Sequence, residues 1–275
     1  MLRRRVITAL CGIPLLVAAV WFDRPLPWFT VLLAIWGLLA AWEFYRMTSA
    51  RRLMYFGLLW TLIFILSRDS RLLSLLEPHF DPELLSPLLF TSAVVLSLFW
   101  LVVDKRRDRA FTGWAWMVAG MLYVGWLLGY LVALRGLDDG RNWVMLALLV
   151  TFGSDTAAFF VGRALGRHRL APQISPGKTW EGAIAGICGA VVVVLLFTLP
   201  TPLQLDIGYW QAVGLGLAVS VFGQAGDLVE SLLKRNTGVK DSGSLLPGHG
   251  GFLDRIDSVI FAGVVVYYYV LWVAI

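Results

Sequence analysis

Apolar runs of roughly 15–22 residues recur along the chain, each long enough to cross a hydrocarbon core about 30 Å thick as a helix. Inside a bilayer every backbone polar group must be satisfied by the protein, so only helices and closed barrels span it. The alternating pattern of barrel strands is absent from this sequence. The sequence therefore predicts an all-α fold, a polytopic membrane helix bundle.

Composition agrees with this fold class. Hydrophobic residues make up 59% of the chain and charged residues 15%, against about 45–50% and about 25% in soluble domains. The net charge of +5 comes from basic residues between apolar runs, where they set orientation and attract anionic headgroups, so we expect no nucleic-acid partner. Cys11 and Cys188 lie within apolar runs and have no ligand-spaced Cys or His, which predicts neither a disulfide nor a zinc site.

About nine transmembrane helices are expected. A cleavable signal peptide is disfavoured because no small-residue cleavage site precedes Trp21. The expected spans are 6–22, 27–45, 53–67, 85–103, 111–134, 142–162, 180–199, 209–227 and 256–275.

Loop charges give the orientation. With a cytoplasmic N-terminus, the inner segments hold 18 of the 23 Lys and Arg residues, and the outer loops hold five. This is the asymmetry expected from the positive-inside rule. We therefore predict an outward C-terminus and a multi-pass protein of the cell (inner) membrane, with its active site facing the cytoplasm.

Residues 1–110 are expected to form N-terminal transmembrane helices, and residues 111–275 a catalytic region with cytoplasmic loops 163–180 and 228–255. A transporter is one class of function open to a multi-pass membrane protein, and its sequence would show internal repeats and polar sites at the membrane midplane. No repeat is visible, and the acids lie near the cytoplasmic ends. Glycines at four-residue spacing, such as Gly182 and Gly186, predict close helix packing.

The loop at 163–180 contains GKT, which invites a P-loop interpretation. The GxxxxGK[ST] motif needs glycine at a position occupied here by Pro172, and no strand is expected before it, so this interpretation is rejected. Ser175, Lys178 and Thr179 still offer hydroxyls and a cation just before an apolar segment.

Acids lie where lipid is expected. Asp155 and Asp227 belong to the inner halves of two spans, and an intramembrane carboxylate is by default a functional candidate. For Asp155 the alternative is a structural pair with Arg163.

Three acids are predicted to converge. Asp254 and Asp257 are three residues apart at the start of the last span, so they share one helix face. An antiparallel neighbour ending at Asp227 would bring its carboxylate close. All-oxygen ligation favours Mg²⁺, and a second cation could assist. For Asp254, a local pair with Arg255 is the competing explanation.

Cations and glycines lie between these acids. Lys234, Arg235 and Lys240 precede the PGHGG sequence at 247–251, whose glycines would let backbone N–H groups approach an anion. Taken singly, the glycines could form only a turn and the cations could serve only orientation. Together they predict a polyphosphate site.

These residues resemble a known family. SLLKR at 231–235, KDSG at 240–243 and HGGFLDRID at 249–257 are similar to the signature of the phosphatidate cytidylyltransferases, or CDP-diacylglycerol synthases. DTAAFFVGR at 155–163 and SPGKTWEG at 175–182 resemble the family's other recurrent segments. One departure is Phe159, where relatives usually carry Tyr.

The resemblance implies the reaction CTP + phosphatidate → CDP-diacylglycerol + pyrophosphate, with Mg²⁺ as cofactor and CTP, phosphatidate and the bilayer as partners. The dianionic lipid phosphate can attack the α-phosphorus without a general base, so catalysis is expected to rest on positioning and charge neutralisation. The catalytic residues implied are Asp227, Asp254 and Asp257, also the metal ligands, with Lys234 and Arg235. The substrate-binding residues implied are Ser175, Lys178, Thr179, Ser231, Lys240, Asp241, His249, Gly250, Gly251 and Asp155.

The alternative enzyme is a CTP-dependent lipid-alcohol kinase. It would transfer the γ-phosphoryl group and need a base for a hydroxyl nucleophile, a role that His249 could fill. The oligomeric state is left open, with a homodimer as one option.

Overall fold

The computed structural model describes residues 2–23, 26–76, 81–103, 110–245 and 250–274, which are mostly helical. The chain divides into two compact units. The first unit comprises Met1–Gly136 and Asp241–Leu253, and the second Leu137–Lys240 and Asp254–Ile275.

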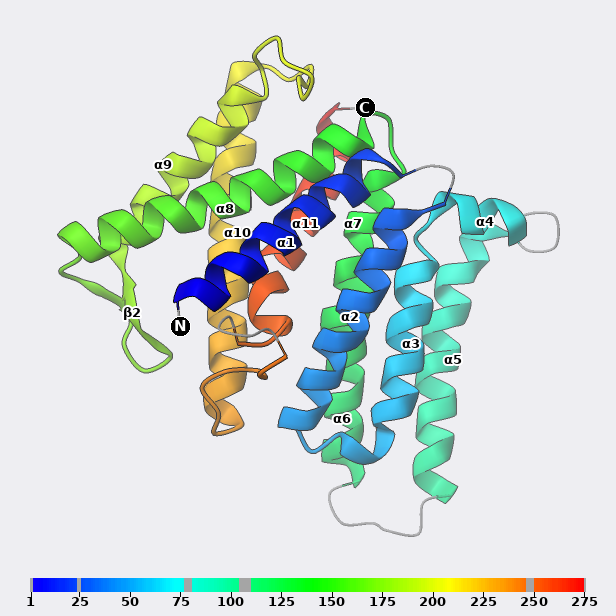
Figure 1. Cartoon of the computed structure of the whole chain (residues 1–275). Coiled ribbons are helices and arrows are strands. Elements are labelled where there is room, and N and C mark those ends of the chain that lie inside the picture. The colour runs from blue at the N-terminus through cyan, green and yellow to red at the C-terminus, as the bar shows by residue number, and fades with distance from the viewer. Residues whose placement is uncertain (1, 24–25, 77–80, 104–109, 246–249, 275) are drawn as a thin grey trace. The chain divides into compact units, whose positions relative to one another are not determined.

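In the first unit, α2, α3, α5 and the continuous helix from α6 through α7 run side by side (Figure 1). Aromatic side chains fill the space between them: the ring of Phe64 lies 4.9 Å from that of Phe90 and 5.6 Å from that of Trp126. The elements are α1 (Leu2–Trp21), α2 (Trp28–Met47), the 3₁₀ turn η1 (Arg51–Leu53), α3 (Met54–Leu66), α4 (Ser70–Leu76), α5 (Pro82–Val103), α6 (Ala110–Gly120), the π-helical η2 (Met121–Trp126) and α7 (Leu127–Arg135).

In the second unit, α9 packs between α8 and α10. An antiparallel hairpin pairs Ala171 with Ser175 and leads into α9. The elements are α8 (Gly140–Leu165), β1 (Arg169–Ala171), β2 (Ser175–Thr179), α9 (Trp180–Leu196), α10 (Tyr209–Asn236), α11 (Leu253–Tyr269) and the π-helical η3 (Val270–Ala274). Leu253, the first residue of α11, belongs to the first unit, and the rest of α11 to the second.

The predicted close approach of helices at small residues is confirmed. A methyl group on Gly182 would meet the Ala158 carbonyl oxygen at 2.8 Å, and one on Gly186 would meet the Ser154 carbonyl oxygen at 3.2 Å. Glycine therefore lets α8 and α9 pack backbone against backbone.

Among the described residues, six helices are long and apolar enough to cross a membrane, so the chain is a multi-pass membrane protein. The nine-span count remains a prediction. The six are Trp28–Met47, Leu84–Val103, Ala110–Arg135, Gly140–Leu165, Tyr209–Asn236 and Leu253–Val273, while Gly12–Trp21 and Trp180–Leu196 are shorter apolar helices.

Two local expectations differ from the structure. The GKT sequence lies in a strand, β2, and another short strand precedes it, whereas no strand was expected there. The helix expected to end at Asp227 continues as α10 to Asn236. It continues because favourable helix formers follow and Leu233 is buried; it ends just before Gly238, whose φ of 74° suits a helix terminus.

Candidate active site

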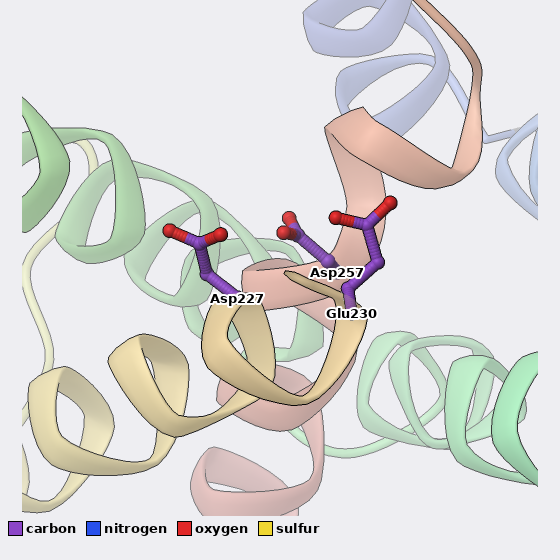
Figure 2. Close-up of side chains that lie close together, drawn as sticks. All are labelled: Asp227, Glu230 and Asp257. Atoms are coloured by element: carbon purple, nitrogen blue, oxygen red, sulfur yellow. The ribbon is translucent and has the colours of Figure 1, made fainter. Parts of the chain in front are cut away.

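Three carboxylates meet between two helices of the second unit. Asp227 and Glu230 are three residues apart on α10 and share a face, while Asp257 lies one turn into α11. One oxygen of each lies within 4.8 Å of the others (Figure 2). Glu230 is 1% exposed and Asp257 8% exposed, so these charges are largely removed from water.

Hydrogen bonds and ion pairs compensate only part of the negative charge of these carboxylates. Asp257 Oδ1 accepts from the backbone N–H of Ser258 at 2.7 Å. Asp227 Oδ2 lies 2.6 Å from Lys178 Nζ. Glu230 Oε2 lies 2.6 Å from Lys234 Nζ, but Glu230 Oε1 is buried with no hydrogen-bond partner among the described residues. A buried carboxylate oxygen without a donor is costly.

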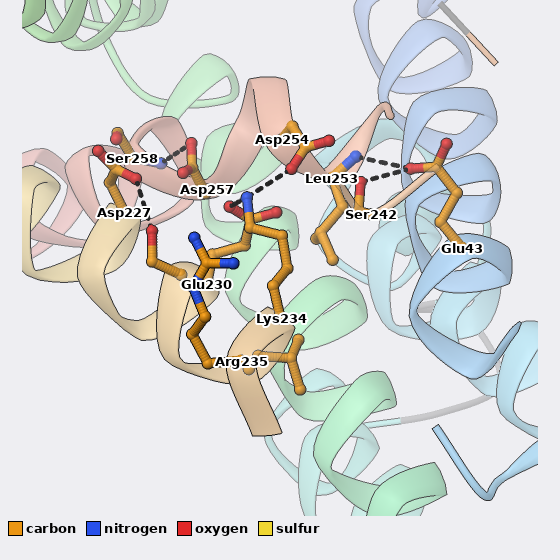
Figure 3. A network of polar contacts seen from close by, with 12 residues as sticks. Glu43, Asp227, Glu230, Lys234, Arg235, Ser242, Leu253, Asp254, Asp257 and Ser258 are labelled. Carbon is orange, nitrogen blue, oxygen red and sulfur yellow. Dashed lines mark hydrogen bonds and ion pairs between the residues drawn. The ribbon is translucent and has the colours of Figure 1, made fainter. Parts of the chain in front are cut away.

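Lys234 joins the carboxylate cluster to Asp254. Its ammonium lies 2.6 Å from both Glu230 Oε2 and Asp254 Oδ1 (Figure 3). Asp254 was expected to be a metal ligand or to pair with Arg255; the structure pairs it with Lys234. In the place that sequence reasoning gave to Asp254, the structure brings Glu230 to the other two acids.

Sequence reasoning missed Glu230 because the helix was expected to end at Asp227, which left Glu230 in a loop. The signal was available: Asp227 and Glu230 have the same three-residue spacing as Asp254 and Asp257. On a continuing helix this spacing puts both side chains on one face.

The hairpin brings a cation to the cluster from another part of the second unit. Lys178, in β2, bonds Asp227 and also lies 3.5 Å from the Gln224 carbonyl oxygen. Thr179 caps α9 by accepting a hydrogen bond from Gly182 N at 3.2 Å. Its hydroxyl therefore has a structural role beside the predicted substrate-binding one.

Two other predicted residues lie on α10. Ser231 Oγ is 3.5 Å from Asp227 Oδ1. Arg235 donates from Nε to the Ile174 carbonyl oxygen, 3.2 Å away, which links the hairpin turn to the end of the helix. Asp155 of α8 interacts electrostatically with Asp227, so the acid of this third helix is near the cluster.

The remaining predicted residues lie in or near the hairpin and the α10–α11 connection. Ser175 begins β2, and the side chains of Lys240 and Asp241 are exposed. Gly250 adopts φ 82°, a conformation that favours glycine, and Gly251 is buried. His249 lies outside the described residues.

The donor set suits a hard divalent cation. Asp227, Glu230 and Asp257 each offer one carboxylate oxygen to a common point, with these oxygens within 4.8 Å of one another. All candidate ligand atoms are oxygens, which Mg²⁺ prefers. Glu230 Oε1, which has no hydrogen-bond partner among the described residues, is an available acceptor.

Known proteins resemble this chain over most of its length. A model of the cytidylyltransferase family matches residues 3–273. A protein named phosphatidate cytidylyltransferase from Bacillus subtilis (strain 168) is 37% identical over 234 residues, which cover 85% of each chain. Proteins of the same name come from Staphylococcus haemolyticus (strain JCSC1435), 42% identical over 64% of this chain and 65% of the relative, and from Staphylococcus aureus (strain COL), 37% identical over 72% and 75%.

Proposed function

This chain belongs to the cytidylyltransferase family, and we propose that it is a membrane phosphatidate cytidylyltransferase that converts CTP and phosphatidate to CDP-diacylglycerol and pyrophosphate. The relatives that match most of its length carry that name. The observation that carries the proposal is the cluster of Asp227, Glu230 and Asp257, with lysines from two elements bonded to it.

We propose that Asp227, Glu230 and Asp257 hold Mg²⁺. The support is their all-oxygen donor set, their approach to within 4.8 Å of one another, and Glu230 Oε1, which has no hydrogen-bond partner among the described residues. When bound, the cation would neutralise phosphate charge and stabilise the leaving pyrophosphate. A second cation is compatible with the further carboxylate of Asp155, which interacts electrostatically with Asp227.

Lys234 has a different part in this proposal from the one expected. Its ammonium bonds Glu230 and Asp254 at 2.6 Å each, and only 13% of its side chain is exposed. It therefore orients the two acids and offsets their mutual repulsion. Asp254 fixes that ammonium in turn, as a positioning residue rather than a metal ligand.

Lys178 and Arg235 are proposed to bind the phosphates. Lys178 is partly exposed and bonds an acid of the cluster, while Arg235 is exposed at the end of α10. Cations at these two places lower the repulsion between an anionic lipid and an anionic nucleotide. Since the lipid phosphate is itself the nucleophile, the reaction needs no general base.

We further propose that the site faces the cytoplasm of the inner cell membrane, with nine spans, the N-terminus inside and the C-terminus outside. The support is the 18-to-five division of Lys and Arg residues. Reporter fusions at the two ends should report opposite sides, and ends on the same side would contradict the nine-span topology. A homodimer remains a prediction, which sedimentation of the detergent-solubilised protein would test.

The reaction can be tested with radiolabelled CTP. Purified protein is incubated with phosphatidate, Mg²⁺ and CTP labelled at either the α- or the γ-phosphorus. We expect the α-label in the lipid product and the γ-label in pyrophosphate. A kinase would instead place the γ-label in a lipid when a lipid alcohol is offered, and lipid label from neither position would refute both enzymes.

A further inference from the structure

Glu43 is a buried acid outside the carboxylate cluster described above. It lies near the end of α2, a helix of the first unit, and is 1% exposed. Burying a carboxylate in an apolar helix is costly unless donors compensate it. What compensates Glu43 therefore indicates why the residue is there.

The donors come from the opposite end of the sequence. Glu43 Oε2 accepts from Ser242 Oγ at 3.2 Å and from Leu253 N at 3.1 Å (Figure 3). Leu253 is the first residue of α11, so its N–H is one of the amides that a helix leaves without an internal acceptor. Glu43 thus caps α11 from another helix, and its negative charge suits the positive end of the helix dipole.

Two glycines of the same segment lie in close contact with the Glu43 carboxylate. A methyl group on Gly243 or on Gly251 would overlap the Glu43 carboxylate. Neither glycine has positive φ, unlike Gly250. Both glycines therefore closely approach a carboxylate of the protein itself, and the phosphate contact that the sequence suggested for the PGHGG glycines stays a prediction.

A ring contact adds a third attachment. Phe252, between Gly251 and Leu253, has its ring centroid 6.2 Å from that of Trp36, which lies two turns before Glu43 on α2. We define the anchored segment as residues 241–245 and 250–253. It is held by α2 through hydrogen bonds, close backbone approach and aromatic packing.

We propose that Glu43 is a positioning residue for cytidylyl transfer: by anchoring this segment and capping α11, it fixes where that helix begins. Asp254 is the next residue after Leu253, and Asp257 follows one turn later. A shift in the helix start would move both acids, and displacements of about 1 Å can cost roughly 10²-fold in rate. This inference rests on the proposed function and gives α2 a role in it.

The test compares Glu43→Ala with Glu43→Gln. The alanine variant removes the acceptor of both hydrogen bonds, whereas glutamine retains one oxygen that can accept them. Hydrogen exchange of the peptide covering 250–256 should become roughly tenfold faster in Glu43→Ala, because a helix-capping bond is lost. kcat/KM of Glu43→Ala should fall roughly 10²-fold. Glu43→Gln should retain most of the wild-type protection from exchange and most of the wild-type kcat/KM.

A matched control is Asp69→Ala. Asp69 is a buried acid of the same unit whose carboxylate also accepts a backbone N–H at the start of a helix, that of Arg71 in α4. No predicted site residue lies in α4. If the role of Glu43 is only structural, the two alanine variants should lower the melting temperature alike and leave kcat/KM of the folded enzyme unchanged, which would overturn the proposal.

Glycine variants give a second measurement that does not depend on the folding of Glu43→Ala. Gly243→Ala should reproduce the faster exchange and slower turnover, whereas Gly214→Ala, where nothing lies within 4 Å of the added methyl group, should change neither. Unchanged exchange and turnover in Gly243→Ala would overturn the positioning role. If the wild type makes no CDP-diacylglycerol, the proposed reaction is wrong, while the exchange data still test the anchoring.

Discussion

Buried acids occur in both units, and their surroundings differ. In the first unit, Asp23 is 3% exposed; it accepts from Phe29 N at 3.0 Å, forms an ion pair with Arg71 and lies 3.9 Å from Arg135. One carboxylate there faces two guanidinium groups.

The carboxylate cluster of the second unit is arranged differently. Among the described residues, Asp227 bonds Lys178, Glu230 shares Lys234 with Asp254, and Asp257 accepts from the Ser258 N–H. Glu230 Oε1 has no hydrogen-bond partner among those residues. Asp23 is a single buried carboxylate with two guanidinium groups near it, which a structural ion pair explains. The cluster instead brings three carboxylates within 4.8 Å of one another, and their mutual repulsion points to a cationic ligand. Convergence of like charges therefore separates the candidate site from the structural ion pair.

The largest effect on activity is expected from Asp257→Asn. The change keeps the size but removes the charge of a proposed metal ligand, so kcat/KM should fall roughly 10²–10³-fold. The measurement is transfer of α-labelled CTP into lipid, with the melting temperature as the control for folding. Near-normal, Mg²⁺-dependent turnover would place the metal elsewhere, with Asp155 and Asp241 as the next candidates.

The next effect distinguishes Glu230 from Asp254. Glu230→Gln should cost about 10²-fold in kcat/KM and raise the Mg²⁺ concentration needed for half-maximal activity, because a proposed ligand loses its charge. Asp254→Asn should cost about tenfold, as expected for a residue that orients a neighbouring group.

The two variants are best compared by titrating Mn²⁺ and following its paramagnetic resonance signal, since this reports binding without turnover. Weaker binding in Asp254→Asn than in Glu230→Gln would restore Asp254 to the ligand set that the sequence predicted.

Lys178→Met is expected to have a smaller effect. It keeps the length of the side chain but removes a cation 2.6 Å from Asp227. KM for CTP or phosphatidate should rise about tenfold, the equivalent of one charge-assisted hydrogen bond. Initial rates over a matrix of both substrates would show which KM changes, and a fall in kcat alone would contradict a phosphate-binding role.

The smallest effect on activity is expected from Asp23→Asn, which tests the structural side of the contrast. The free energy of unfolding should fall by about 1–3 kcal/mol, because the donors around the buried Asp23 lose their charged acceptor. kcat/KM per folded molecule should stay within about twofold of the wild type. Thermal unfolding followed by tryptophan fluorescence, beside the α-label assay, would check both. A large loss of activity without loss of stability would contradict the purely structural role of Asp23.

The sequence alone determined the class of fold and much of the site. The lengths of the apolar runs require membrane helices, and the acids at 227, 254 and 257 stand out because a charge in such a run needs compensation. The signature at 231–257 pointed to the family that the comparisons show. These inferences could be drawn from the sequence because they rest on local properties: hydropathy, charge and spacing along one chain.

The tertiary structure decided which groups meet. Lys178 reaches Asp227 from a hairpin, and Lys234 reaches Asp254 from another helix. Glu43 caps α11 across 210 residues of sequence. Pairings of this kind depend on how helices pack, and helical periodicity specifies which face a residue occupies but not what covers that face. Glu230 shows the limit most clearly: its spacing from Asp227 was visible, but only the continuation of α10 to Asn236 turned that spacing into a shared face.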